Sequence, residues 1–164
     1  MKKLLLIALL LTFSTLAFAQ DQTTFILVRH AEKADDGTRN PPLNEDGKVR
    51  ANDLASLLAN QEITGLYSTP FKRTEETLQP IAEAKDLEIM TYDPLAKDEW
   101  LKALADKHSG GTVVISGHSN TIPGLANALL GEETFEQFDE SDYTNLIIIV
   151  TDEVGKGKLV RLKF

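Results

Sequence analysis

The run Thr-Phe-Ile-Leu-Val at residues 24–28 is followed at once by Arg29 and His30, and this stretch decides the fold. A short apolar, β-branched run is typical of a strand that is buried on both faces of a parallel sheet. In such sheets, ligands bind beyond the carboxyl ends of the strands. The polar pair that follows the run is therefore where we expect chemistry.

Working outward from this run, predicted strands and helices alternate along the chain. Further strands are expected over residues 63–68, 87–92, 112–115, 146–150 and 158–163, and helices over 45–60, 70–84, 98–108 and 121–130. Asn44 is expected to cap the first helix, Pro70 to open the second, and Pro80 to kink or break it. The alternation predicts one α/β domain with three layers (αβα) and a mostly parallel central sheet that carries an antiparallel edge strand.

The first nineteen residues have the pattern of an export signal. Lys2 and Lys3 precede an apolar run over 4–11, and Ala17-Phe18-Ala19 has small residues where a signal peptidase reads the chain. A transmembrane anchor is the alternative, but the run is shorter than the ~20 residues that span a bilayer. We expect cleavage after Ala19, a single domain over 20–164, a periplasmic or secreted location and no lasting membrane anchor.

Composition excludes several classes of protein. The chain has 164 residues, 17 basic and 25 acidic, a net charge of −8 and no cysteine. This length suffices for one domain with a core and is too short for two of ordinary size. The missing cysteine excludes a disulfide scaffold, thiolate zinc, thiol catalysis and a lipid-anchored cysteine. The acidic balance argues against a nucleic-acid partner.

Polar residues gather at three junctions that follow predicted strands. The junctions are Arg29-His30 after the first strand, Ser-Thr-Pro-Phe-Lys-Arg-Thr at 68–74 after the second, and Ser-Gly-His-Ser-Asn at 116–120 after the fourth. Arg29, Arg73, His30 and His118 are therefore expected to meet on one rim of the sheet. Guanidinium groups suit phosphate oxygens, and an imidazole can act as nucleophile or proton carrier. The combination predicts phosphoryl transfer without a metal.

Each of these signals also has an ordinary structural interpretation. An Arg-His pair after a strand is most often a solvated loop, and an arginine on an amphipathic helix, such as Arg73, is usually a surface ion pair. We assign His108, before Ser109-Gly110-Gly111, to a structural role at a helix end, and expect Glu75 and Glu76 to be solvated. A metal site on two histidines is the competing site, but no third ligand has suitable spacing.

Four motifs together are similar to those of a known family. They are Val-Arg-His-Ala-Glu-Lys (28–33), Leu-Asn-Glu-Asp-Gly (43–47), Ser-Thr-Pro-Phe-Lys-Arg-Thr-Glu-Glu-Thr (68–77) and Ser-Gly-His-Ser-Asn-Thr (116–121). In this order they resemble the histidine phosphatase superfamily, the phosphoglycerate mutase-like group. Ser119 stands where the family's second branch has an acidic residue, so the chain looks most like the small SixA-like members of the first branch.

The resemblance implies a role for each matching residue. His30 would be the nucleophile that takes the phosphoryl group, Arg29 and Arg73 would bind the phosphate, and His118 would lie across the group in transfer. No cofactor is implied. Larger first-branch members place an acid after the third strand, which makes Asp98 the first candidate for the proton donor, ahead of Glu99 and Asp93. Asp98 is equally suited to cap the helix that begins there.

The resulting expectation is an exported phosphomonoesterase that acts on a small phosphorylated substrate through a phosphohistidine intermediate, without metal. The short chain favours hydrolysis over mutase activity. Two alternatives stay open: a protein that binds phosphorylated ligands without turning them over, and a phosphohistidine protein phosphatase. Oligomeric state and the physiological substrate are not determined by the sequence.

Overall fold

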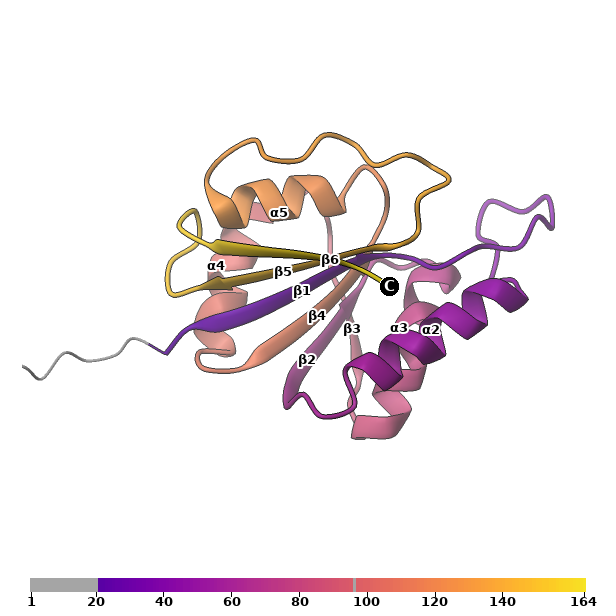
Figure 1. Cartoon of the computed structure of the whole chain (residues 1–164), viewed down its shortest axis with the longest axis horizontal. Coiled ribbons are helices and arrows are strands. Elements are labelled where there is room, and N and C mark those ends of the chain that lie inside the picture. The colour runs from indigo at the N-terminus through magenta and orange to yellow at the C-terminus, as the bar shows by residue number, and fades with distance from the viewer. Residues whose placement is uncertain (1–20, 96) are drawn as a thin grey trace, which may run out of the picture.

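Within the part of the chain that the computed structural model describes, residues 21–95 and 97–164 without the side chains of 97 and 98, six strands form one sheet (Figure 1). The strands are β1 (Thr23–Arg29), β2 (Ile63–Ser68), β3 (Ile89–Thr91), β4 (Thr112–Gly117), β5 (Asn145–Thr151) and β6 (Lys158–Lys163). The helices are α2 (Glu45–Leu57), α3 (Lys72–Lys85), α4 (Lys97–Lys107) and α5 (Ile122–Leu130). The predicted export signal at 1–19 lies outside the described residues.

The strand order is β3-β2-β4-β1-β5-β6, and the four strands from β3 to β1 pair in parallel. β5 pairs antiparallel with both β1 and the edge strand β6. The predicted α/β fold, mostly parallel with antiparallel pairing at one edge, is confirmed. Arg29 aligns with Gly117, and Ser68 with Ser116, so β1, β2 and β4 end at the same edge of the sheet.

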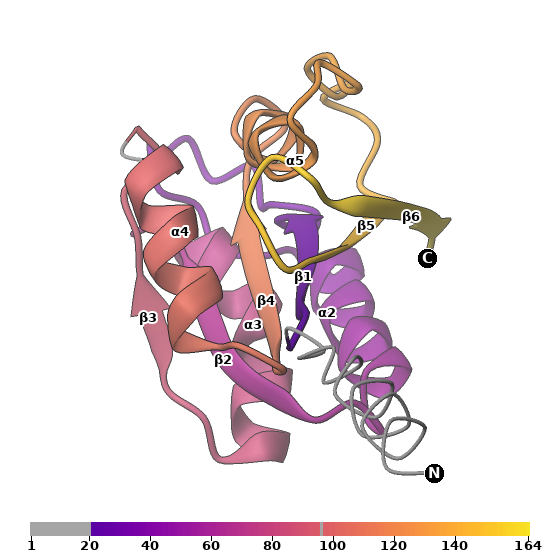
Figure 2. The ribbon, with the colours of Figure 1, turned by 90° about the vertical axis from the view of Figure 1, so that its left-hand side faces the viewer.

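Helices cover both faces of the sheet, as Figure 2 shows. Side chains alternate along β1, so Phe25 and Leu27 pack with α4 and α5 in one cluster, whereas Ile26 and Val28 pack with α2 and α3 in another. Burial on both faces explains why this strand is apolar without alternation. Among the described residues, no helix has both the length and the apolar character needed to cross a bilayer.

Two prolines, one before α3 and one inside it, were expected to shape this helix. Phe71 has an extended backbone (φ −127°, ψ 137°), so the helix begins at Lys72 and Pro70 precedes it. Of the kink or break predicted at Pro80, the break does not occur, because α3 continues through that residue to Lys85. Buried Leu78 and Ile81 flank the proline, and their packing offsets the hydrogen bond that proline cannot donate.

The start of α2 fixes the segment that follows β1. The Asn44 side chain accepts a hydrogen bond from the Gly47 amide (2.8 Å), which confirms the predicted cap, and the Asn44 amide donates to the Glu32 carbonyl (2.9 Å). A Cβ on Gly47 would lie 2.1 Å from the Glu32 oxygen, so only glycine allows this approach. Glu76, expected to be solvated, instead accepts from the Leu43 amide (2.7 Å) and holds the same segment.

Candidate active site

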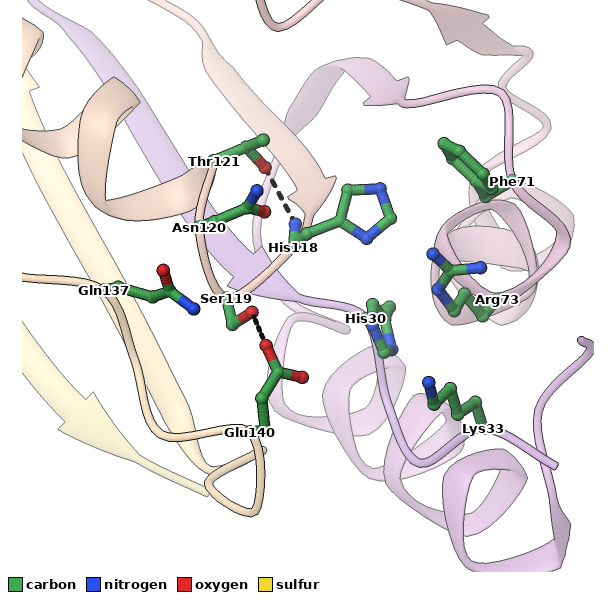
Figure 3. A pocket seen from close by; sticks show the side chains of 10 residues that line it. All are labelled: His30, Lys33, Phe71, Arg73, His118, Ser119, Asn120, Thr121, Gln137 and Glu140. Carbon is green, nitrogen blue, oxygen red and sulfur yellow. Dashed lines mark hydrogen bonds between the residues drawn. The ribbon is translucent and has the colours of Figure 1, made fainter. Parts of the chain in front are cut away.

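Three of the four predicted site residues line one cavity at the carboxyl edge of the sheet, and the fourth lies beneath its wall. His30, Arg73 and His118 face a cavity of about 410 Å³ (Figure 3). The imidazole rings of His30 and His118 have centroids 5.4 Å apart at 67°. Arg29 is buried, its side chain only 1% exposed. Further residues around this cavity are Lys33, Phe71, Ser119, Asn120, Thr121, Gln137 and Glu140.

His30 has one ring nitrogen engaged and one without a partner. Its Nδ1 lies 2.7 Å from the Ala31 carbonyl oxygen, which can only accept, so Nδ1 carries the hydrogen in the neutral ring. Nε2 then holds a lone pair, and it has no hydrogen-bond partner among the described residues. Burial, with added repulsion from Arg29 and Arg73, lowers the pKa of His30 to about 3. The imidazole is therefore neutral at ordinary pH, as a nucleophile must be.

His118 is held by a pair of threonine hydroxyls that the sequence analysis did not single out. Its Nε2 lies 2.9 Å from Thr69 Oγ1, which lies 3.0 Å from Thr74 Oγ1. The Thr74 hydroxyl donates to the Thr69 and Phe71 carbonyls (2.9 and 2.8 Å). Both threonines belong to the 68–77 motif. Their hydroxyls, placed where a strand passes into a helix, are the sequence feature that could have pointed to this role.

The electrostatic surroundings keep His118 uncharged in the free site. Burial first, then Arg73 and Arg29, lower the pKa of His118 to about 4. A phosphate dianion between these groups would act in the opposite direction and raise the pKa, because opposite charge favours the protonated ring. His118 can therefore gain its proton when an anion enters.

Arg73 offers free hydrogen-bond donors. Its Nε and Nη1 are buried and have no partner among the described residues, and its guanidinium lies 4.6 Å from the centroid of the Phe71 ring. Buried N–H groups are almost always paired in folded proteins, and leaving one unpaired costs roughly 1–3 kcal/mol. A tetrahedral oxyanion in the cavity is the acceptor that this geometry favours.

Arg29 is instead clamped by the loop that precedes β5. Its Nη1 donates to the carbonyl oxygens of Asp139 (3.0 Å), Glu140 (2.8 Å) and Asp142 (3.3 Å). Its Nη2 forms an ion pair with Glu140 Oε2 at 2.8 Å, and Tyr143 stacks on the guanidinium, 4.1 Å from ring centroid to Cζ. Only its Nε is buried without a partner. The loop thus fixes the position of this arginine before any ligand binds.

Glu140 is a site residue that sequence reasoning missed. One carboxylate oxygen pairs with Arg29 and the other accepts from the Ser119 hydroxyl (Figure 3). The Ser119 hydrogen bond, followed by Arg29, lowers the pKa of Glu140, so the group is ionised. Its side chain is 67% exposed. Nothing in the sequence distinguishes it from the other acidic residues, because it follows no strand and lies in a loop.

Of the three candidate proton donors, one lines a cavity that His118 also lines. Asp98 falls in the first turn of α4, and its side chain lies outside the described part of the chain. Glu99 is exposed. Asp93 lines a second cavity that it shares with His118, and its Oδ1 accepts from the Leu95 amide (2.9 Å). Among the described side chains, no three His, Cys, Asp or Glu residues gather as a metal-binding group.

Comparison with known proteins was consistent across sequence and structure. The sequence profile of the histidine phosphatase superfamily (branch 1) matches residues 25–96. Phosphoserine phosphatase 1 of Hydrogenobacter thermophilus is 43% identical over 74 residues, which are 42% of this chain and 35% of that protein. The matched segment thus spans about a third of the length of this relative.

Solved structures match over most of the chain. The protein histidine phosphatase SixA, complexed with tungstate, is similar with a TM-score of 0.71 at 20% identity, over 85% of this chain and 96% of that one. Phosphoserine phosphatase from Entamoeba histolytica, in complex with 3-phosphoglyceric acid, has a TM-score of 0.69 at 17% identity, over 87% and 97%. Residues 25–96 thus resemble the histidine phosphatase superfamily (branch 1), and the chain shares the fold of these solved phosphatases.

Proposed function

We propose that this chain is an exported, metal-independent phosphomonoesterase that works through a phosphohistidine on His30. One observation carries the proposal: the lone pair of His30 Nε2 is unengaged at a cavity lined by the unpaired donors of Arg73. A neutral imidazole beside a cationic oxyanion site has the composition required for nucleophilic phosphoryl transfer. The match of residues 25–96 to the histidine phosphatase profile supports the same reaction class.

In the first step, His30 Nε2 attacks phosphorus and the bond from phosphorus to the ester oxygen breaks. The departing alkoxide takes a proton from a donor beside it. Asp98 remains the proposed donor, and Asp93 is the alternative that borders the cavity next to His118. In the second step, water attacks phosphorus, the P–N bond breaks, and the proton of the water passes to the donor group. His30 is regenerated and inorganic phosphate leaves.

The charges around the cavity serve the transition state of both steps. Arg73 supplies unpaired buried donors at the cavity, and the positive charge of Arg29 acts on both His30 and His118. Donors that are already in place need no reorganisation when charge develops. The threonine pair holds His118 across from His30. The negative charge of the incoming phosphate dianion raises the pKa of His118, so that the ring can take up a proton.

The proposed substrate class rests on the volume of the cavity and on the predicted export of the protein. A cavity of about 410 Å³ suits a small phosphomonoester. The relatives named above are phosphoserine and protein histidine phosphatases, so a phosphohistidine on another protein is the second candidate. The export pattern at 1–19 favours small esters outside the cytoplasm, because cytosolic signalling proteins are not present there.

Trapping the phosphoenzyme tests the proposal. Wild type mixed with radiolabelled phenyl phosphate and quenched in alkali should retain label that acid removes, and EDTA should not change the yield. His30→Asn should retain none. His108→Asn is the matched control, because it alters the third histidine of the chain, and it should label like wild type. Phosphate binding without label in wild type would indicate a non-catalytic binder and refute the proposal, and loss of label with EDTA would refute metal independence.

A further inference from the structure

A second cavity of about 370 Å³ adjoins the first, and its walls are mainly apolar. Pro70 and Phe71 form one side, and Tyr92 and Pro94 form another. The Tyr92 hydroxyl donates to the Ser116 carbonyl (3.4 Å), so it is turned to the protein rather than to a ligand. Ligand sites are commonly concave and mostly apolar with a few polar groups, and this cavity fits that description.

The two cavities meet at His118 and Phe71, which line both. The edge of one ring faces the other, with centroids 5.1 Å apart at 88°, and Figure 3 shows the pair on the side of the site away from Glu140. His30 lines the first cavity and not the second. In phosphoryl transfer, the attacking and leaving groups lie roughly in line on opposite sides of phosphorus. A phosphoryl group attacked by His30 therefore directs its ester oxygen away from His30, toward His118.

We propose that the second cavity binds the alcohol portion of the substrate, and that the preferred substrates are monoesters of neutral, apolar alcohols. This inference rests on the proposed phosphatase activity and names the substrate class of that site. An alkyl or aryl group leaves water for the walls of Pro70, Phe71 and Pro94 on binding. Asp93 at the border of the cavity disfavours a second anionic group on the alcohol.

A homologous series of linear alkyl phosphates, from ethyl to hexyl, tests the inference. The alcohols of this series have nearly the same acidity, so chain length changes binding and not the chemistry of departure. Because burial of one CH₂ contributes about 0.8 kcal/mol, kcat/KM of wild type should rise by up to about fourfold for each added carbon that enters the cavity. Glycerol phosphate and phosphoglycerate should be poorer substrates than butyl phosphate.

Thr91→Asp places a charge at the rim of this cavity without touching the phosphate site, because Thr91 is exposed and lines only the second cavity. We expect a loss of at least tenfold in kcat/KM for hexyl phosphate and less than threefold for ethyl phosphate. Met90→Asp, the preceding and exposed residue of β3, lines neither cavity and should leave the chain-length dependence unchanged.

The outcomes separate this inference from the proposed function. Hydrolysis of every alkyl ester at the same rate, equal losses for hexyl and ethyl phosphate in Thr91→Asp, or the same selective loss in Met90→Asp would each overturn the apolar subsite and leave the phosphatase intact. Absence of both hydrolysis and a trapped phosphoenzyme in wild type would overturn the two together.

Discussion

The three histidines of the chain lie in two regions, and the comparison separates the two imidazoles proposed as catalytic from a structural one. His30 and His118 follow β1 and β4 at the carboxyl edge of the sheet, whereas His108 follows α4 and precedes β4 at the opposite edge. Burial is the largest cause of a lowered pKa at all three. Burial and a shifted pKa therefore do not distinguish the site.

What differs is the hydrogen bonding of the rings. His108 uses both nitrogens, with Nε2 2.9 Å from the Tyr67 hydroxyl and Nδ1 3.0 Å from Thr64 Oγ1. His30 and His118 each have a single ring hydrogen bond among the described residues. The structural role assigned to His108 agrees with this bonding. Burial lowers the pKa of His108 and so favours its neutral ring.

The largest effect is expected when the site loses Arg73, the arginine whose donors are unpaired. Arg73→Ala should lower kcat/KM for phenyl phosphate by about 10²–10³, because it removes charged donors that are aimed at the developing oxyanion. Arg73→Lys should recover part of the loss, since it restores the charge without the fork. Steady-state kinetics checks both. Arg39→Ala changes an exposed arginine that lines neither cavity, and its kcat/KM should stay near that of wild type. A large loss in this variant would mean that the effect of Arg73→Ala is not specific to the site.

The opposite prediction holds for the structural histidine. His108→Asn should reduce the free energy of unfolding by about 1–3 kcal/mol, because it removes the hydrogen bonds of the ring to Tyr67 and Thr64 and its edge contact with the Tyr67 ring. Urea denaturation measures the change, and kcat/KM of the folded variant should remain within about twofold, since no contact of the active site changes. A drop in activity without a drop in stability would reverse the assignment of the two regions.

Glu140→Gln tests the ion pair between Arg29 and Glu140. The carboxylate pairs with Arg29 and repels an incoming anion, so its neutralisation should tighten inhibition by tungstate about three- to tenfold. The inhibition constant measured against phenyl phosphate reports the change. Glu136→Gln, an exposed acid of the same loop, should have less than half of that effect. Weaker inhibition in Glu140→Gln would indicate that Glu140 serves mainly to position Arg29.

A separate effect, on no kinetic constant, is expected in the pH dependence of stability. His30 has a folded pKa of about 3, below its unfolded value of 6.5, so the unfolded chain alone binds this proton between those values. Stability is therefore retained above pH 6.5 and lost as the pH falls below it. Between pH 6.5 and 4.5, the free energy of unfolding should fall less in His30→Asn than in wild type. The difference is at most about 1.4 kcal/mol for each pH unit. Equal slopes in chemical denaturation of the two proteins would contradict the lowered pKa.

Most of the fold follows from local patterns, and the departures have tertiary causes. The apolar run at 24–28 and the cap at Asn44 were sufficient to predict β1 and the start of α2. The helix does not break at Pro80, because propensity describes an isolated helix, whereas the packing of Leu78 and Ile81 holds α3 together. β3 is only three residues long, shorter than the strand predicted over 87–92.

The sequence by itself determined which side chains stand at the ends of β1, β2 and β4. Parallel strands in register bring their carboxyl ends to one edge, so Arg29, His30, Arg73 and His118 could be assigned to one site from the pattern alone. Only the tertiary structure decided that Glu140, 111 residues from Arg29, forms an ion pair with that arginine. The same holds for the two cavities that meet at His118. Loop contacts over such separations have no periodicity in the sequence, because they arise from how the finished layers pack rather than from local backbone preference.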